Sequence, residues 1–314
     1  MLVSTKLFIV TSVLVMINLV LIVVVIIVSP RSCSAKQVKG PDVRIIGGVP
    51  VDIRNHQFAA AIVIKKHGGL DSNRLQCGGS ILSLKWVVTA AHCLILLEDQ
   101  KFTKEVVYIS AGHSAWNRGY KHEIMAWAYH EDYDKTIMND DIGLIRVRQS
   151  LNKNNEKRIS LASIKYKYEA GRQIRVIGWG VTSFNGKISD YLNAVDVYIF
   201  KQTYCIYLYG EYALETTGMP SKVTASMFCA GHKEGGRDAC QFDSGGPIFD
   251  HGLLIGIVSW GVECAVKTQP GVYTRINLYK DWIMKTTKKL NAPLYITNPN
   301  DRRFNSRRKS AKTN

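Results

Sequence analysis

Acidic residues, prolines and glycosylation signals are all scarce in this chain of 314 residues. It has 25 Asp and Glu against 41 Lys and Arg, which gives a formal net charge of +16. With eight prolines and no Gly-X-Y period, a collagen-like chain is excluded. No Asn-x-Ser/Thr triplet occurs, so N-glycosylation is not expected. No internal repeat is visible.

What the chain does contain is enough apolar material for a large core. Hydrophobic residues make up 46% of it, with 15 Tyr, nine Phe and six Trp, which excludes a disordered chain. The length suits two domains or one fold of two lobes. The positive charge fits binding of nucleic acid, an acidic membrane surface or an acidic protein, and also simple solubility. Seven cysteines is an odd number, so one of them needs its own explanation.

The N-terminal region carries a long uncharged stretch, from Leu7 to Ser29, made mostly of Val, Ile and Leu. The apolar core of a secretory signal usually has about 7–15 residues, whereas a helix of about 20 residues spans a bilayer. By its length the stretch therefore matches a membrane-spanning helix. Its position directly after Lys6 is typical of a signal peptide, and small residues allow cleavage after Ala35. Residues 1–35 are therefore predicted to be a signal peptide or a signal anchor. In both cases the rest of the chain is expected outside the cell, where disulfides can form. It would be secreted if the segment is removed, or anchored to the membrane through residues 7–29 until activation if the segment is retained.

After residue 44 the chain consists of short β-type runs separated by Gly, Asn, Asp and Lys, a pattern typical of a sandwich or barrel. Leu278–Leu290 is the one segment with convincing helical spacing. The Lys-rich stretch Leu151–Glu169 is expected to link two β halves, and Asn291–Asn314 to form a basic mobile tail. The expected strands are Ala60–Ile64, Trp86–Thr89, Val106–Ser110, Ile142–Val147, Gln173–Ile177, Val195–Ile199, Leu253–Trp260 and Gly271–Ile276.

Three segments together indicate nucleophilic catalysis: TAAHC at 89–93, NDDIGL at 139–144 and DSGGP at 243–247. A serine hydroxyl is a weak nucleophile and needs an adjacent base. Histidine can serve as that base, and a buried carboxylate fixes its tautomer and stabilises the imidazolium. The chain order His, Asp, Ser is one of the orders in which this triad occurs. Each segment alone is ordinary loop or strand-end chemistry, but the combination is not.

These segments resemble those of the trypsin-like serine proteases over residues 45 to about 291. The resemblance makes His92 the general base and acid, Asp141 the carboxylate that orients it, and Ser244 the nucleophile. Asp140 is then only the neighbour of the functional aspartate. The fold that it implies is all-β, two packed antiparallel six-stranded β-barrels with a C-terminal helix, and its domain is expected to span residues 45–290.

The resemblance also implies a zymogen. Residues 36–44 would be an activation propeptide cleared by a cut between Arg44 and Ile45. The new ammonium group, once buried, needs a carboxylate partner, because an unpaired buried charge is costly. By resemblance that partner is Asp243, and pairing would assemble the substrate pocket. The activating enzyme would be another trypsin-like protease or the protein itself.

Specificity is implied by residues around the serine. Asp238, six residues before Ser244, would lie at the base of the primary pocket and select Arg or Lys side chains. Gly261 and Gly271 would keep the pocket walls open, and Ser259 with Gly261 would pair with the substrate backbone. Glu263 stands at the rim, where many relatives have Gly.

One position departs from the family pattern. Phe242 stands where a glycine normally provides one of the two backbone N–H groups of the oxyanion hole, the other being that of Ser244. Losing one such donor costs about 100–1000-fold in rate. The N–H of Phe242 is expected to be misdirected, since glycine tolerates conformations that bulky residues avoid. We expect a protease slower or narrower than a digestive trypsin and poorly fitted by protein inhibitors.

The cysteines pair by resemblance, with one left over. The family pattern gives Cys77 with Cys93, Cys205 with Cys229 and Cys240 with Cys264, whereas spacing alone leaves 15 connectivities for six cysteines. A further bridge common in vertebrate members is missing, because Ile174 and Asp250 stand at its positions; three bridges are typical of invertebrate members. Cys33 lies before the activation cut and is expected to separate from the catalytic domain. No metal or cofactor is expected. Zinc is not indicated, because no zinc-ligand spacing accompanies Cys77, His92 and Cys93. Calcium is not indicated either, because the stretch that corresponds to the calcium loop of trypsins begins at His113 and has few acidic residues.

The charge divides unevenly along the chain. Residues 1–44 hold five basic and one acidic residue and the tail from Asn291 six and one, which leaves +7 for the body. The tail could bind a polyanion or remain solvated. The protein is expected to act as a monomer on proteins or peptides with Arg or Lys before the cut. The alternative function is a catalytically weak protease homologue that binds or regulates partners.

Overall fold

The computed structural model describes residues 48–65, 72–181, 186–217, 223–236, 239, 242–262, 267 and 269–295. The uncharged stretch 7–29 lies outside this part of the chain, as do the activation site and the basic residues of the tail. Among the described residues there is no helix whose length and hydropathy would let it cross a bilayer.

Six strands in the first half close into a barrel in the order β2, β3, β4, β7, β6, β5. All six residues of β2 and all four of β4 are buried, and both are rich in the β-branched residues that favour strands. The strands are β2 (Ala59–Ile64), β3 (Arg74–Ile81), β4 (Trp86–Thr89), β5 (Val107–Ala111), β6 (Tyr120–Tyr129) and β7 (Gly143–Val147).

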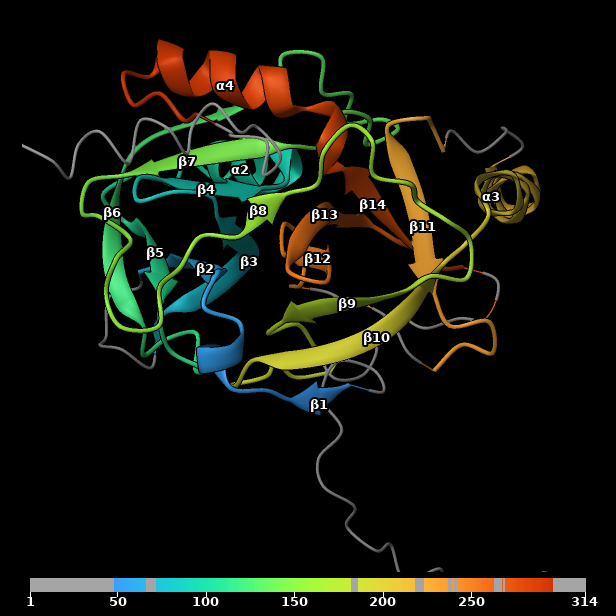
Figure 1. Cartoon of the computed structure of the whole chain (residues 1–314), viewed down its shortest axis with the longest axis horizontal. Coiled ribbons are helices and arrows are strands. Elements are labelled where there is room, and N and C mark those ends of the chain that lie inside the picture. The colour runs from blue at the N-terminus through green and yellow to red at the C-terminus, as the bar shows by residue number, and fades with distance from the viewer. Residues whose placement is uncertain are drawn as a thin grey trace, which may run out of the picture. The chain divides into compact units, whose positions relative to one another are not determined.

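Six strands in the second half close in the same way, since β9 pairs with both β10 and β12. Two short strands extend this sheet: β1 (Val49–Pro50) pairs with β10, and β8 (Ser160–Leu161) pairs in parallel with β13. The expected pair of six-stranded barrels is thereby confirmed (Figure 1). The second set of strands is β9 (Gln173–Gly178), β10 (Asn193–Ile199), β11 (Met227–Gly231), β12 (Pro247–Asp250), β13 (Leu253–Trp260) and β14 (Gly271–Arg275).

The C-terminal helix α4 (Lys280–Lys289) is confirmed within the expected segment. Its Trp282 and Ile283 are buried against the first barrel, and Asp281 near its start with Lys288 near its end suits the helix dipole. A 3-10 turn, η3 (Ile276–Leu278), precedes it, and another, η1 (Ile53–Asn55), follows β1. Figure 1 shows α4, in red, along the barrel that contains β4 and β7.

Two further helices were not expected from the sequence. Helix α2 (Ala91–Asp99) follows β4 and buries Ala91, Leu94 and Leu97, which are three residues apart. Helix α3 (Gln202–Thr217) packs on β11 through Cys205, Leu208 and Tyr209. In both helices, a few buried residues at helical spacing stabilise the helix by packing on the barrels, although strong capping residues are scarce in these segments.

The start of the C-terminal tail also differs from expectation. Ala292 and Leu294 pack against the core of the first barrel, and Trp86 donates a 2.6 Å hydrogen bond from Nε1 to the carbonyl of Ala292. Leu294 N–H donates to Thr287 Oγ1 at 3.1 Å. The chain is therefore anchored for several residues beyond α4.

Candidate active site

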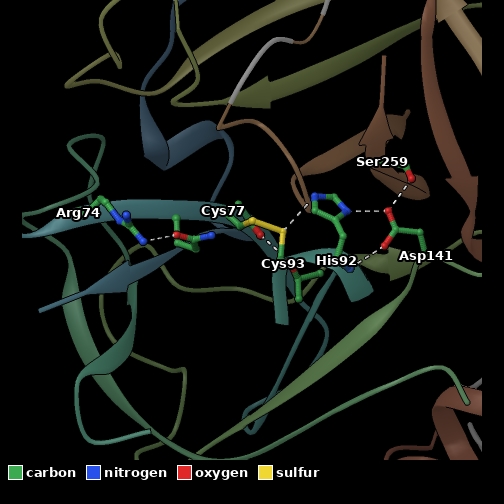
Figure 2. The surroundings of a disulfide bond; sticks show 9 residues. Arg74, Cys77, His92, Cys93, Asp141 and Ser259 are labelled. Carbon is green, nitrogen blue, oxygen red and sulfur yellow. Dashed lines mark hydrogen bonds and ion pairs between the residues drawn. A yellow bond between two sulfur atoms is a disulfide. The ribbon is translucent and has the colours of Figure 1, made fainter. Parts of the chain in front are cut away.

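His92 and Asp141, which the sequence predicts as a pair, are in direct contact. His92 Nδ1 lies 2.8 Å from Asp141 Oδ2, and the backbone N–H of His92 donates to Oδ1 at 2.9 Å. The Asp141 side chain is fully buried and that of His92 is 13% exposed. Both carboxylate oxygens thus hold one residue, which fixes the ring in the tautomer with its proton on Nδ1 (Figure 2).

Asp141 also joins the two barrels, through its carboxylate and its backbone carbonyl. Ser259 on β13 donates a 2.5 Å hydrogen bond from Oγ to Oδ2, and Thr274 Oγ1 on β14 donates to the Asp141 carbonyl at 2.9 Å. Asp141 itself stands two residues before β7. Figure 2 shows the carboxylate between His92 and Ser259.

Asp140, the neighbouring aspartate, is used elsewhere. Its carboxylate accepts a 2.6 Å hydrogen bond from Tyr279 Oη and a 2.7 Å bond from Asn139 Nδ2. The geometry therefore assigns the imidazole to Asp141.

The electrostatics of the pair suit a base that is charged during a reaction. Burial by itself lowers the pKa of His92, but the charge of Asp141 and its hydrogen bond outweigh burial and raise the pKa above its usual 6.5. Burial raises the pKa of Asp141, yet the charge of His92 and the hydrogen bonds from His92 and Ser259 bring it below its usual 3.8. Asp141 is therefore an anion throughout the neutral range.

Ser244 lies on a tight turn directly before β12 that is clamped between the barrels. Its carbonyl accepts from Gly78 N–H at 2.8 Å, and Gly245 N–H donates to the Val258 carbonyl at 2.8 Å. Gly245 has φ +77°, and a Cβ there would lie 2.1 Å from Thr89 Oγ1, so only glycine fits. The motif DSGGP thus positions the serine through its backbone.

Ser244 and His92 open into one cavity of about 540 Å³ between the barrels, which Phe242 and Gln76 also line. His92 Nε2 lies 3.6 Å from Cys93 Sγ, and no hydrogen bond joins the Ser244 hydroxyl to His92 in the described part of the chain. Figure 2 shows the ring placed between the disulfide and Asp141. Catalytic hydrogen bonds of this kind are commonly long before substrate binds.

Phe242 adopts the backbone conformation that a glycine would favour. Its φ is +71°, in the left-handed region that costs an L-residue about 1–2 kcal/mol. The side chain is 37% exposed and lines the cavity. Within the described residues, neither Phe242 N–H nor Ser244 N–H donates to another group, so both are available to an oxyanion. Phe242 thus adopts the conformation that a bulky residue was expected to avoid, while the expected misdirection of its N–H stays a prediction.

Asp243 is completely buried beside the serine. Its Oδ1 accepts from Gly180 N–H at 2.7 Å, and a Cβ on Gly178 would lie 2.0 Å from the same oxygen. This tight fit explains why residue 178 is a glycine, for which the sequence offers no earlier signal.

Two of the three expected disulfides lie within the described residues, and both are formed there. Cys77 is bonded to Cys93 with a Cα–Cα distance of 6.2 Å, and Cys205 to Cys229 at 6.0 Å. The first bridge braces the start of α2, which carries His92. It also uses both thiols of the Cys77, His92, Cys93 group, so that this group offers a metal only one imidazole.

Several predicted residues lie outside the described part of the chain, so that their roles stay predictions. They are Cys33, Arg44, Ile45, Asp238, Cys240, Glu263 and Cys264. Gly261 and Gly271 are described and are neighbours, since a Cβ on Gly261 would lie 4.0 Å from Gly271 Cα.

Sequence reasoning missed the hydroxyls that support the site. Thr274 is one, and Thr89 is another, since its Oγ1 donates to the Gly78 carbonyl at 2.9 Å. Thr89 stands within the histidine motif, which could have drawn attention to it. Thr274 carries no local signal, because its role arises only when β14 lies beside Asp141.

Comparison with known proteins agrees with this geometry. A family model described as Trypsin matches residues 45–283. Trypsin alpha of Drosophila melanogaster is 35% identical over 252 residues, which cover 79% of this chain and 90% of that protein. Trypsin alpha-4 of Lucilia cuprina is 36% identical over 245 residues (77% and 87%), and trypsin V-B of Rattus norvegicus 32% over 245 residues (78% and 90%).

Proposed function

Because this chain belongs to the trypsin family of serine proteases, we propose that it is an endopeptidase that hydrolyses peptide bonds after Arg or Lys. The observation that carries the proposal is the buried Asp141 carboxylate holding His92 by two contacts, in a cavity shared with Ser244. Such a pair has no need of a metal or cofactor to activate a hydroxyl.

In this mechanism Ser244 Oγ attacks the scissile carbonyl while His92 Nε2 takes the hydroxyl proton. Asp141 stabilises the imidazolium that forms, and the raised pKa of His92 agrees with that role. The N–H groups of Phe242 and Ser244 stabilise the oxyanion. His92 returns the proton to the leaving amine, and water then hydrolyses the acyl-enzyme by the same steps in reverse.

Substrate recognition would use the second barrel. Asp238 would face the cationic side chain, while the adjacent Gly261 and Gly271 leave its path open. Ser259 has a part in both tasks, since its hydroxyl contacts Asp141 and its backbone lies on β13 where a substrate strand would add.

Activation would follow a cut after Arg44. The Ile45 ammonium would pair with Asp243, whose full burial suits a partner for a buried cation. The cut would also release residues 1–44, whether residues 7–29 are a signal peptide or an anchor, and leave Cys33 behind. We propose that the enzyme acts outside the cell and is activated by a trypsin-like protease, with the basic tail free to bind polyanions.

The test is cleavage profiling of the protein activated at Ile45 on a peptide library, beside the Ser244→Ala variant. Cleavage after Arg and Lys that is absent in the variant supports the proposal, and Asp238→Asn should abolish the preference for basic residues. An active-site phosphonate that labels the activated protein but not Ser244→Ala identifies an assembled triad. An unlabelled protein without cleavage would instead be the binding homologue.

A further inference from the structure

A second cavity lies on the second barrel and shares no residue with the catalytic one. It has a volume of about 600 Å³, and its lining includes Ile199, Phe200, Lys201, Tyr204, Lys233 and Lys267. Pockets of this size and mixed lining are typical of binding sites.

The floor of this cavity is apolar and fixed. Ile199 ends β10 and is 2% exposed, and Phe200 is 6% exposed with its N–H bonded to the Cys229 carbonyl at 2.9 Å. The Tyr204 ring stands 6.0 Å from the Phe200 ring and forms one wall. These two rings contact each other, so an apolar side chain would pack over the exposed Tyr204 ring at the edge of this floor.

The rim is cationic. Lys201, Lys233 and Lys267 all border the cavity and are exposed. Glu234 pairs with Lys267 at 2.8 Å, but among the described residues no carboxylate pairs with Lys201 or Lys233. With three lysines and one glutamate in its lining, the site has a net charge of +2 beside an apolar floor.

The exposed face of α3 continues this surface. Tyr204 and Tyr207 are 49% and 58% exposed, with stacked rings 6.4 Å apart, and Ile206 between them is 43% exposed. Tyrosines that leave this much ring in water are typical of protein interfaces.

Helix α3 is tied to the catalytic cleft. Tyr209 packs on Trp260 at 4.8 Å between ring centroids and donates a 2.5 Å hydrogen bond to the Pro270 carbonyl. Trp260 follows Ser259, whose hydroxyl contacts Asp141. A partner held on α3 is thereby held at a fixed place relative to the cleft.

We propose that this cavity binds an acidic peptide segment of another protein, with one apolar side chain packed on Tyr204 beside the Phe200 floor and carboxylates facing Lys201 and Lys233. An acidic peptide is favoured over a sulfated polysaccharide because the apolar floor needs an apolar side chain, which a polysaccharide lacks. The proposal goes beyond proteolysis and is tested by binding alone.

The test uses the full chain with Ser244→Ala, so that no peptide is cleaved, and a fluorescent peptide of Glu and Asp around one Phe. The double variant Lys201→Glu, Lys233→Glu should bind the peptide about tenfold or more weakly. Higher salt should weaken binding to the protein that keeps both lysines. The matched control, Lys153→Glu with Lys157→Glu, reverses two exposed lysines of the segment between β7 and β8 and should leave binding unchanged. Tyr204→Ala, and a peptide with Ser in place of Phe, should both bind less tightly.

Absence of peptide binding, or equal binding to the two lysine pairs, would overturn the proposal. Heparin that binds through Lys201 and Lys233 while the peptide does not would make the cavity a polysaccharide site and would overturn it too. Near-ultraviolet circular dichroism checks the fold of each variant. If the double lysine variant does not fold, unchanged peptide binding by Tyr204→Ala would still overturn the proposal.

Discussion

The hydroxyl of Ser259 donates a 2.5 Å hydrogen bond to the same Asp141 oxygen that contacts His92 Nδ1. The serine belongs to the second barrel and the aspartate to the first, so this bond joins the two halves at the centre of the site. Asp141 has no exposure, so each of its hydrogen bonds replaces water that the carboxylate has lost.

Ser259→Ala should therefore destabilise the protein by about 1.5–3 kcal/mol near pH 7, the usual size for a hydrogen bond to a charged group. Because the Asp141 pKa lies below its usual 3.8, this stabilisation is complete above that pH and disappears as the pH falls through the folded-state pKa. Urea unfolding at several pH values measures it.

The control for this variant is Ser226→Ala, which removes two neutral hydrogen bonds of 2.7 Å, to Asn139 and to Thr224. Each bond should be worth about 0.5–1.5 kcal/mol, and the cost should not depend on the ionisation of Asp141. A cost of Ser259→Ala that is as independent of pH as that of Ser226→Ala would contradict a special role for the Ser259 bond.

The raised pKa of His92 gives a prediction for activity. Only the neutral imidazole can take a proton, so kcat/KM for an Arg substrate should rise with pH through a midpoint above 6.5. Asp141→Asn removes the charge that raises this pKa and leaves burial, which lowers it. The midpoint should then fall below 6.5, while the rate drops about 10⁴-fold because the favoured tautomer is lost. A midpoint that does not move would show that the Asp141 charge does not set it.

Phe242 offers a way to separate backbone strain from the effect of its ring. Phe242→Gly removes both, whereas Phe242→Ala removes the ring and keeps a Cβ at φ +71°. The Gly variant should gain about 1 kcal/mol of stability over the Ala variant. Both variants should have a higher kcat/KM for substrates with a bulky leaving group and should bind protein inhibitors more tightly, because the ring lines the cavity beside Ser244. If kcat/KM and inhibitor affinity stay unchanged in both variants, the ring does not restrict the cleft.

A buried hydrogen-bonded pair joins β6 of the first barrel to the segment after β7, away from the catalytic residues. Glu156 contacts His122 Nε2 at 2.7 Å and accepts from Lys153 N–H at 2.7 Å, with both side chains at most 1% exposed. Glu156→Ala leaves the buried His122 Nε2 and the Lys153 N–H without their acceptor and should cost about 3 kcal/mol. Glu123→Ala is the matched control, since its 2.9 Å pair with Arg148 is more than half exposed and should be worth less than about 1 kcal/mol. Thermal unfolding of both variants compares them.

Local sequence patterns predicted many of the strands, and the strands that they did not predict were missed for physical reasons. Runs of β-branched residues such as those in β4 and β13 were readable as strands. In contrast, β3 contains Gly78 and Gly79, and β12 begins with a proline, so composition concealed both. They are strands because the barrels close around them, which is a long-range effect.

The candidate site shows the same division. The pairing of His92 with Asp141 was expected from the motifs and from their resemblance to those of the trypsin-like proteases. The contacts of Ser259 and Thr274 with Asp141 depend on how two barrels meet, which no local spacing records. Phe242 takes its positive φ because the turn around Ser244, held by backbone hydrogen bonds from the N–H groups of Gly78, Gly245 and Gly246, outweighs the preference of one residue.

The anchored start of the tail gives the last prediction. Truncation after Leu290 removes the acceptor for buried Trp86 Nε1 and the packing of Leu294, and should cost about 2–4 kcal/mol. Truncation after Tyr295 keeps both contacts while removing every basic residue of the tail, so its unfolding free energy should match that of the full chain. Differential scanning calorimetry of the two truncations compares them, and heparin-column elution of the second shows whether the distal tail binds polyanions. Equal stability of the two truncations would mean that residues 291–295 contribute nothing to the fold.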